Sequence, residues 1–353
     1  MTLRFEAVVA KRDFDVAFSV ADGETVAVLG PNGAGKSTLL TLISGLLAPD
    51  SGSAELHGKT LFRIGPGARR VWRPPHDRGV SLLAQEALLF PHLSVLNNVA
   101  FGPTSAGGKK KDAYASARSW LAEVDATEFE QRKPAQLSGG QAQRIAVARA
   151  LAAEPRLLLL DEPMAALDIA VAPALRRTLR RVLENRTAII VTHDILDAFT
   201  LADRVIVIDK GRIVEDGATR LVLERPRDAF TAGIAGLNLL TGVRTRTGIR
   251  TADGVELAMT APEPIAVGDG CSAALRPADV RVSTEAPAAG ANALRVRVTD
   301  LEPRGDLVRV RSAALSADTT PAEVADLDLA PGSEVWFTFR AADAVVYSAA
   351  RRR

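Results

Sequence analysis

The sequence predicts a mainly parallel α/β domain over residues 1–235, followed by a smaller all-β domain over residues 239–353. Three observations predict this division. Up to about residue 235, short apolar runs alternate with helical stretches, the pattern of a parallel sheet covered by helices. From Leu239 onward, short β-like runs are cut by Gly, Pro and Asp, and lysine does not occur after Lys210. The length of 353 residues also exceeds what one hydrophobic core usually organises.

The expected strands of the first domain are short. A half-buried antiparallel strand is expected near the N-terminus, where Phe14, Val16, Phe18 and Val20 alternate with smaller or polar residues. Strands that are buried on both faces of a parallel sheet read as continuous apolar runs. Five such runs of four or five residues occur: Thr25–Leu29, Val80–Leu83, Leu157–Leu160, Ala188–Val191 and Val205–Ile208.

A helical insertion is expected within this domain at about residues 86–155. No strand run appears between Gln85 and Pro155, whereas Tyr114–Val124 and Gln141–Ala152 have helical spacing. In the following part of the domain, four arginines at helical spacing are expected to form a solvent-exposed helix face. They are Arg176, Arg177, Arg180 and Arg181.

A weak internal repeat runs through the all-β domain. Gly268, Arg276 and Asp279 recur, each 64 positions later, as Gly332, Arg340 and Asp343. Two similar small barrels, over residues 239–286 and 291–353, would produce this pattern, with a linker at residues 286–290. A chance match of three residues in an alanine-rich sequence is the alternative.

Composition and charge exclude several classes of protein. The 44 Lys and Arg against 42 Asp and Glu give a net charge of +2, which excludes a strongly basic nucleic-acid coat, and no nucleic-acid partner is expected. The single cysteine, Cys271, cannot form an internal disulfide, and this fits a reducing cytosol. The N-terminus carries no secretion signal, and no apolar run approaches the roughly 18 residues of a membrane span. We therefore expect a chain that is neither secreted nor membrane-spanning by itself.

A phosphate-binding loop is predicted at residues 30–38, between a predicted strand and a predicted helix. Glycines let successive backbone N–H groups turn toward an anion, and the helix start adds a positive dipole. Lys36 is expected to reach the β- and γ-phosphates, and the Ser37 hydroxyl is expected to ligate Mg²⁺. The alternative is a glycine-rich turn without a ligand. The residues that match the pattern G-x-x-x-x-G-K-[ST] and its following position are Gly30, Pro31, Asn32, Gly33, Ala34, Gly35, Lys36, Ser37 and Thr38.

Two carboxylates follow the apolar run that ends at Leu160. Asp161 and Glu162 are expected at the carboxyl edge of the sheet, where ligands of α/β proteins bind. Asp161 suits the Mg²⁺ shell, usually through water, and Glu162 suits polarising the water that attacks the γ-phosphate. The alternative is that the two acids only cap the next element.

A second phosphate site is predicted at residues 138–141. Ser138, Gly139, Gly140 and Gln141 stand at the start of a helical run, so their backbone donors face a possible anion. One chain has no obvious use for two clamps on a γ-phosphate.

These motifs together resemble the ATPase subunit of ATP-binding-cassette (ABC) transporters. In that family two copies face each other head to tail, and the signature sequence of one closes on ATP held by the other. The resemblance implies a phosphate-loop ATPase cassette with a helical subdomain, ATP and Mg²⁺ as ligands, and a homodimer. The motifs that occur in the family's order are residues 30–38, Gln85, Leu137–Gln141, Asp161 with Glu162, the turn at 165–168, and His193.

The resemblance also implies roles for single residues. Gln85 would sense and ligate Mg²⁺ and couple the attacking water to the helical insertion. His193 would hydrogen-bond the γ-phosphate and hold Glu162 and the water in register. Asp168 would form the turn that meets the partner's phosphate loop, although Ala165 stands where the family commonly has Ser.

The adenine contact is left open between two residues. The family stacks an aromatic ring ahead of the phosphate loop, and Phe14 is the nearest candidate. Its alternation with Val16 and Phe18 fits a core position equally well. Arg12 could stack through its guanidinium plane instead.

The segment Leu89–Val95 resembles the part of importer ATPases that receives a coupling helix of the membrane permease. The tail resembles the oligonucleotide/oligosaccharide-type barrels (TOBE, molybdate-binding type) that follow such ATPases. These resemblances imply an importer ATPase for an oxyanion, molybdate by preference, at the cytoplasmic face of the cell membrane. Its partners would be permease subunits and, indirectly, an extracytoplasmic solute-binding protein. The alternatives are a sulfate, iron, polyamine or sugar importer, or a soluble cassette protein outside transport.

An oxyanion site in the tail is an open prediction. Residues 241–353 contain 14 Arg against 15 Asp and Glu, so bulk charge does not hold an anion there, and hydroxyl and N–H groups would have to. Thr319, Thr320 and Arg340 are the candidates, although the family often has Lys where Arg340 stands. A purely structural or dimerising role for the barrels is the alternative.

Overall fold

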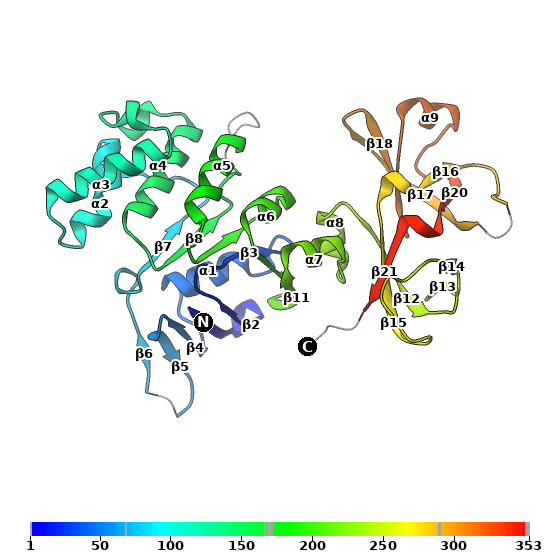
Figure 1. Cartoon of the computed structure of the whole chain (residues 1–353), viewed down its shortest axis with the longest axis horizontal. Coiled ribbons are helices and arrows are strands. Elements are labelled where there is room, and N and C mark those ends of the chain that lie inside the picture. Colours follow the sequence, from blue (N-terminus) through cyan, green and yellow to red (C-terminus); the bar gives the residue numbers. More distant parts are fainter. Residues whose placement is uncertain (1, 68, 166, 168–171, 289–290, 350–353) are drawn as a thin grey trace. The chain divides into compact units, whose positions relative to one another are not determined.

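The computed structural model describes residues 2–67, 69–165, 167, 172–288 and 291–349 (Figure 1). The chain divides into two compact units, the N-terminal unit of residues 1–219 and the C-terminal unit of residues 220–353. The division falls after the first residue of the short helix α7 (Thr219–Glu224) and before α8 (Ala229–Ile234), whereas the sequence predicts the boundary after both helices. In the described part of the chain, no helix is both long and apolar enough to cross a membrane.

A six-stranded sheet forms the centre of the N-terminal unit, with the order β11-β10-β3-β9-β8-β7. All neighbours pair in parallel except β11, which is antiparallel to β10. The five predicted apolar runs are confirmed as strands of this sheet. Their bounds are β3 Thr25–Leu29, β7 Val80–Leu83, β8 Leu157–Asp161, β9 Ala188–Val191 and β10 Arg204–Asp209, and the edge strand is β11 Arg212–Ala218.

The N-terminal unit also contains an antiparallel sheet of order β2-β1-β4-β5-β6. The predicted alternation is confirmed in β2, where Phe14 and Val16 are buried and Asp15 and Ala17 are exposed. Side chains of helix α1 (Lys36–Ser44) share one apolar cluster with residues of both sheets, so α1 lies between them. The strands are β1 Leu3–Val9, β2 Phe14–Val20, β4 Ser51–Leu56, β5 Lys59–Ile64 and β6 Val71–Trp72.

The carboxyl end of α1 is fixed by a buried arginine. Arg78 is 1% exposed and donates from Nη1 to the carbonyl oxygens of Leu42 at 2.8 Å and Ile43 at 2.9 Å. These carbonyls have no partner within the helix, so a cation there satisfies them and complements the helix dipole. Burial lowers the pKa of Arg78 to about 10, which leaves the guanidinium charged at neutral pH. The helix that follows the phosphate loop is thereby held at its far end.

The helical insertion is confirmed between β7 and β8. It contains α2 (Val95–Ser105), α3 (Lys110–Glu123) and α4 (Gly139–Ala152), and residues 84–156 contain no strand. Val99, Leu121 and Ile145, one from each helix, are fully buried in a common cluster. Two further helices, α5 (Ala172–Leu183) and α6 (Ile195–Leu201), follow β8 and β9 respectively.

The C-terminal unit consists of two antiparallel five-stranded sheets that share one apolar cluster. Their orders are β14-β13-β12-β15-β21 and β16-β20-β17-β18-β19. The order β14-β13-β12-β15 in the first sheet corresponds to β19-β18-β17-β20 in the second, because each strand matches the one that comes five strands later in the chain. The remaining strands, β16 and β21, are exchanged, so that each lies in the other sheet. The predicted repeat residues occupy equivalent places, because Arg276 pairs with Asp279 at 2.8 Å and Arg340 pairs with Asp343 at 2.7 Å, each after an equivalent strand.

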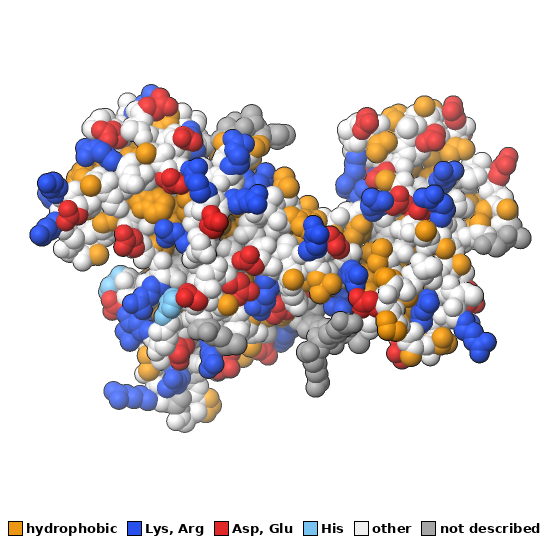
Figure 2. Space-filling view, in the orientation of Figure 1, with side chains coloured by type: hydrophobic (Ala, Val, Ile, Leu, Met, Phe, Trp, Pro, Cys, Tyr) orange, Lys and Arg blue, Asp and Glu red, His pale blue; other side chains and the backbone are white. Residues whose placement is uncertain are grey.

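The elements of the C-terminal unit are short, apart from β17. Among its described strands lie one α-helix, α9 (Pro321–Asp326), and two 3-10 turns, Pro277–Asp279 and Ala341–Asp343. Figure 2 shows Lys and Arg interspersed with Asp and Glu on the drawn face of each unit, in agreement with the net charge of +2. The strands are β12 Asn238–Arg244, β13 Gly248–Thr251, β14 Glu256–Ala258, β15 Gly270–Leu275, β16 Arg281–Ser283, β17 Asn292–Arg304, β18 Leu307–Ser312, β19 Ser316–Thr319, β20 Glu334–Phe339 and β21 Ala344–Ser348.

Candidate nucleotide site

The predicted phosphate loop joins β3 to α1 and depends on glycine at two positions. Gly35, the N-cap of α1, has φ +109, and a Cβ there would lie 2.8 Å from the Phe14 ring. A Cβ at Gly30 would lie 2.2 Å from the carbonyl oxygen of Ile208. No other residue type fits these places, because the backbone packs directly against the chain on both sides. The loop therefore presents backbone N–H groups at the start of a helix, which is an anion-binding arrangement.

One cavity of about 540 Å³ lies at the carboxyl edge of the parallel sheet, at the ends of β3, β7, β8 and β9, where a ligand is expected. Arg12 lines the same cavity from the turn between β1 and β2. Nine of the predicted site residues line this cavity, whereas Gly30, Pro31 and Ala34 belong to the loop without lining it. The lining residues are Arg12, Asn32, Gly33, Gly35, Lys36, Ser37, Thr38, Gln85, Asp161, Glu162 and Val191.

Lys36 is the buried cation of this cavity. It is 8% exposed, and its Nζ donates to the carbonyl oxygens of Gly30 at 2.6 Å and Pro31 at 3.0 Å. Burial lowers the pKa of Lys36, and the nearby carboxylates of Glu162 and Asp161 oppose this shift. The ammonium has three donors, so with two used on the loop a third is available for a phosphate oxygen.

The two predicted carboxylates lie at the end of β8 in different surroundings. Burial raises the pKa of Asp161, the charge of Glu162 raises it further, and Lys36 opposes both. Glu162 adopts a left-handed backbone conformation with φ +45, and its backbone N–H donates to the carbonyl of Val191 at 2.9 Å. A non-glycine residue in this conformation is strained, and such strain is typical of functional sites. Its side chain is 19% exposed, so water can reach it.

The donor set fits Mg²⁺. Ser37, Gln85 and Asp161 present hydroxyl, amide and carboxylate oxygens to one cavity, and Mg²⁺ prefers oxygen ligands from few protein groups together with substrate phosphates. Among the described residues, no cluster of three or more His, Cys, Asp and Glu side chains could hold a metal alone. These residues would thus share the ion with a bound triphosphate.

His193 follows β9 and lies beside the base candidate. Its Nδ1 is 3.3 Å from Oε1 of Glu162, and its side chain is 66% exposed. Because β8 and β9 are parallel neighbours with Asp161 opposite Val191, the two loops start side by side. The structure therefore brings His193 to Glu162, although His193 does not line the cavity around Lys36.

The Ser138–Gln141 turn opens helix α4 through a capping box. Ser138 Oγ accepts from the backbone N–H of Gln141 at 3.3 Å, and the Gln141 side chain accepts from the backbone N–H of Ser138 at 2.9 Å. Ser138 and Gly139 are exposed, and no residue of the turn lines the cavity around Lys36. Within one chain the two predicted phosphate sites thus remain separate. The predicted turn residue Asp168 lies outside the described residues.

The structure separates the two adenine candidates. Phe14 is 1% exposed and packs beneath Gly35, so its ring has no free face for a base. Arg12 lines the cavity, and its Nη1 donates to Thr38 Oγ1 at 3.0 Å. Of the two, only Arg12 can contact a ligand in this cavity.

We expect Arg12→Ala to weaken ATP binding by about 3- to 30-fold, because a guanidinium beside an aromatic base contributes roughly 0.5 to 2 kcal/mol. Calorimetric titration with ATP measures this change. Lys11→Ala, one residue away, is the matched control and should bind ATP as the unaltered chain does. An unchanged ATP affinity in the Arg12 variant would remove this residue from the site.

One expectation about the helix after β8 is wrong. Arg177, Arg180 and Arg181 are exposed as predicted, but the Arg176 side chain is only 14% exposed and pairs with two aspartates. Sequence reasoning missed this group because the aspartates come from another helix. The signal that could have found it is the position of Arg176 one turn before the buried Leu179, at the border of the apolar stripe.

The phosphate loop, the carboxylate pair at the neighbouring strand end and the helical insertion define the chain as a P-loop ATPase. A family model described as ABC transporter matches residues 14–165, and one described as TOBE domain matches residues 273–347. The chain belongs to the ABC transporter family, as an ATP-hydrolysing cassette followed by a TOBE domain.

Its relatives include the molybdenum import ATP-binding protein ModC of two Mycobacterium tuberculosis strains. Each is 45% identical over 362 residues, which cover 98% of this chain and 97% of the relative. The molybdate/tungstate import ATP-binding protein WtpC of Pyrococcus horikoshii is 33% identical, with 93% of both chains covered. A solved dimeric post-hydrolysis state of the ATP-binding cassette MJ0796, bound to ADP and Pi, matches with a TM-score of 0.54 and 28% identity. It covers 62% of this chain and 99% of that cassette.

Proposed function

We propose that the chain is the ATPase subunit that powers an importer of an oxyanion, with molybdate as the preferred solute. The observation that carries this proposal is the 45% identity to a molybdenum import ATP-binding protein over 98% of the chain, so that both units are matched. Likeness in the cassette alone supports ATP hydrolysis but not a particular solute, because a solute need never touch this subunit.

The proposed reaction gives roles to the phosphate loop, to the polar residues around the cavity and to His193 beside it. The N–H groups of residues 33–38 and the Lys36 ammonium bind the phosphates. Glu162 accepts a proton from the attacking water, and His193, 3.3 Å from its carboxylate, holds that carboxylate toward the γ-phosphate. Ser37, Gln85 and Asp161 would hold Mg²⁺, whose charge offsets that of the phosphates.

The exposed Ser138–Gln141 turn supports a homodimer. The turn presents a capped helix start at the surface, away from the cavity of its own chain. Two chains that face each other head to tail would place it on the γ-phosphate in the partner's cavity and close that cavity to water. The solved relative of the cassette is dimeric, which agrees with this arrangement.

An aromatic patch in the chain segment that follows Gln85 supports docking of a membrane permease. Phe90 lies 4.5 Å from Phe101, with the guanidinium of Arg149 at 5.3 Å from the Phe90 ring. The buried Asn98 accepts from the backbone N–H of Phe90 and donates to its carbonyl, which fixes the segment. Phe101 is 43% exposed and Leu88 is 64% exposed, so the patch offers an apolar surface for a permease helix. The chain would then act as a peripheral subunit at the cytoplasmic membrane face.

The oxyanion site of the C-terminal unit stays a prediction, and the structure gives its three candidates other partners. Thr320 caps α9 by accepting from the N–H of Glu323 at 3.2 Å, and the Thr319 hydroxyl contacts the Glu323 carboxylate. Arg340 is paired with Asp343. Arg340 does line a cavity of about 430 Å³ together with Arg281, and an anion bound there would have to compete with Asp343.

The experiment that tests the proposed function uses Ser138→Asp and Ser138→Asn. Both substitutes are good N-cap residues, so helix α4 keeps its cap, but only Asp places a negative charge at the expected γ-phosphate. With the permease and solute-binding protein in vesicles, we expect ATP-dependent molybdate uptake with Asn and a loss of about 100-fold or more with Asp. ATP binding to the isolated chain should be equal in the two variants, since the turn lies outside the chain's own cavity.

Uptake is measured with molybdate, tungstate and sulfate as solutes. Transport of sulfate in preference to molybdate would refute the assigned solute while leaving the ATPase role intact. Equal uptake by the Asp and Asn variants would instead refute the role of the Ser138 turn at a phosphate.

A further inference from the structure

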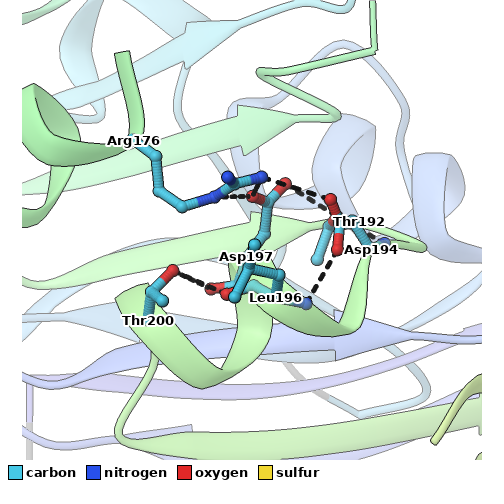
Figure 3. A network of polar contacts seen from close by, with 6 residues as sticks. All are labelled: Arg176, Thr192, Asp194, Leu196, Asp197 and Thr200. Atoms are coloured by element: carbon cyan, nitrogen blue, oxygen red, sulfur yellow. Dashed lines mark hydrogen bonds and ion pairs between the residues drawn. The ribbon is translucent and has the colours of Figure 1, made fainter. Parts of the chain in front are cut away.

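A partly buried network of ion pairs and hydrogen bonds joins α5 to the start of α6, next to His193 in the chain (Figure 3). Arg176 of α5 reaches across to α6 and donates from Nε to Oδ1 of Asp197 at 2.7 Å. Its Nη2 donates to Oδ2 of Asp194 at 3.2 Å. One planar guanidinium therefore holds two carboxylates of a neighbouring element at once, a geometry that an ammonium does not reproduce.

The pair between Arg176 and Asp197 is removed from water. The Asp197 side chain is 2% exposed and that of Arg176 is 14% exposed. Burial raises the pKa of Asp197, and the hydrogen bond and charge of Arg176 oppose this shift. A buried carboxylate needs such a partner, so the position of Asp197 depends on Arg176.

The network continues to the residues on both sides of His193. Thr192 Oγ1 donates to Oδ2 of Asp197 at 3.3 Å and accepts from the backbone N–H of Asp194 at 3.0 Å. Asp194 Oδ1 in turn accepts from the backbone N–H of Leu196 at 2.7 Å and caps α6. The backbone of His193 is thus held from either side, while its imidazole stays 66% exposed beside Glu162.

The network joins the two helices that follow the strands delivering the reacting groups. Glu162 follows β8 and His193 follows β9, and these strands are parallel neighbours. Arg176 lies on α5, the helix after β8, whereas Asp194 and Asp197 cap and begin the helix after β9. Asp194 and Asp197 also line a cavity of about 210 Å³ together with Glu162 and His193. We therefore expect a displacement of Arg176 to move His193 more than it moves the phosphate loop.

From this geometry we infer that Arg176 is a positioning residue for ATP hydrolysis, which acts through Asp197 and Thr192 to hold His193 against Glu162. The inference rests on the role of His193 in the proposed function. Arg176 lies outside the cavity around Lys36 and touches no reacting atom. The competing view is that the network only fastens α5 to α6, in which case its loss would lower stability and leave the turnover of folded protein unchanged.

The experiment compares Arg176→Ala with Arg177→Ala in the full chain, each alone and combined with His193→Ala. Arg177 is the neighbouring exposed arginine of the same helix, outside the network. We expect Arg176→Ala to lower kcat by about 10- to 100-fold, since small misplacements of catalytic groups have effects of this size. The Kd for ATP should stay within about twofold, because the phosphate loop does not depend on the network. Arg177→Ala should change neither quantity.

The double variant separates positioning from general damage. If Arg176 acts through His193, adding Arg176→Ala to His193→Ala lowers kcat no further. If the double variant instead lowers kcat by the product of the two single effects, the inference is wrong. A loss of ATP binding, or an unchanged kcat, in folded Arg176→Ala would also overturn it. Normal hydrolysis by His193→Ala alone would refute the proposed role of His193, and the inference with it. An unchanged kcat in Arg176→Ala beside an impaired His193→Ala refutes the inference only.

A milder pair of variants tests the same link if Arg176→Ala does not fold. Thr192→Ser keeps the hydroxyl that joins Asp197 to the loop, whereas Thr192→Val removes it at nearly the same volume. We expect Ser to retain kcat and Val to lower it by about 10-fold at unchanged ATP affinity. Equal turnover in the two variants would contradict the inference.

Discussion

Glu162→Gln is expected to lower ATP turnover by about 10²- to 10⁴-fold, the usual contribution of a positioned general base. The amide has the shape of the carboxylate but does not accept a proton from water. The left-handed backbone at residue 162 and its hydrogen bond to Val191 do not involve the side chain and should persist. ATP binding should therefore survive, and phosphate release measures the loss of turnover.

The same variant is expected to accumulate as an ATP-bound dimer. In the proposed function, hydrolysis reopens the pair of chains, so blocking it should leave the closed state populated. Light scattering with ATP and Mg²⁺ reports the mass. Glu184→Gln, an exposed glutamate outside the cavity, is the control and should hydrolyse ATP normally. Turnover close to that of the unaltered chain in Glu162→Gln would remove this residue from the catalytic role.

Lys36→Ala is expected to weaken ATP binding by about 100-fold or more. The variant loses charge-assisted hydrogen bonds to phosphate, worth roughly 1.5 to 3 kcal/mol each. It also leaves Asp161 and Glu162 without the cation that opposes their charge, so the cavity repels a triphosphate. Calorimetric titration with ATP gives the change in Kd.

Thermal unfolding of Lys36→Ala measures how much the loss of two loop contacts lowers the stability of the chain. The ammonium donates to the carbonyls of Gly30 and Pro31, so the variant is expected to unfold at a somewhat lower temperature. Lys59→Ala, which removes an exposed lysine far from the loop in sequence, is the control. Near-normal ATP affinity in a folded Lys36 variant would show that the cavity does not bind phosphates through this lysine.

Most of the N-terminal unit could be predicted because its signals are local. The five buried strands are continuous apolar runs, and the phosphate loop is one short segment whose glycines are required by close packing at Gly30 and Gly35. The order of the carboxyl-edge loops follows from parallel pairing, so the meeting of Lys36, Gln85 and Asp161 was open to prediction.

The features that could not be predicted depend on partners far apart in sequence. In the sequence, Arg176 is one of four arginines expected at the surface. Only the fold brings it to Asp194 and Asp197 at the start of α6. Alternation alone does not separate a core position from an adenine contact for Phe14, because it does not show what lies above the ring. In the structure Gly35 takes that place. The sequences of β16 and β21 likewise do not show that these two strands are exchanged between the sheets of the C-terminal unit.

We propose that two chains share each ATP, and a crystal structure of the Glu162→Gln variant with ATP and Mg²⁺ would test this. We expect a γ-phosphate within hydrogen-bonding distance of Lys36 Nζ from one protomer and of the partner's Ser138 from the other. A γ-phosphate that is bound by Lys36 but meets only solvent or residues of its own chain on the opposite side would contradict it.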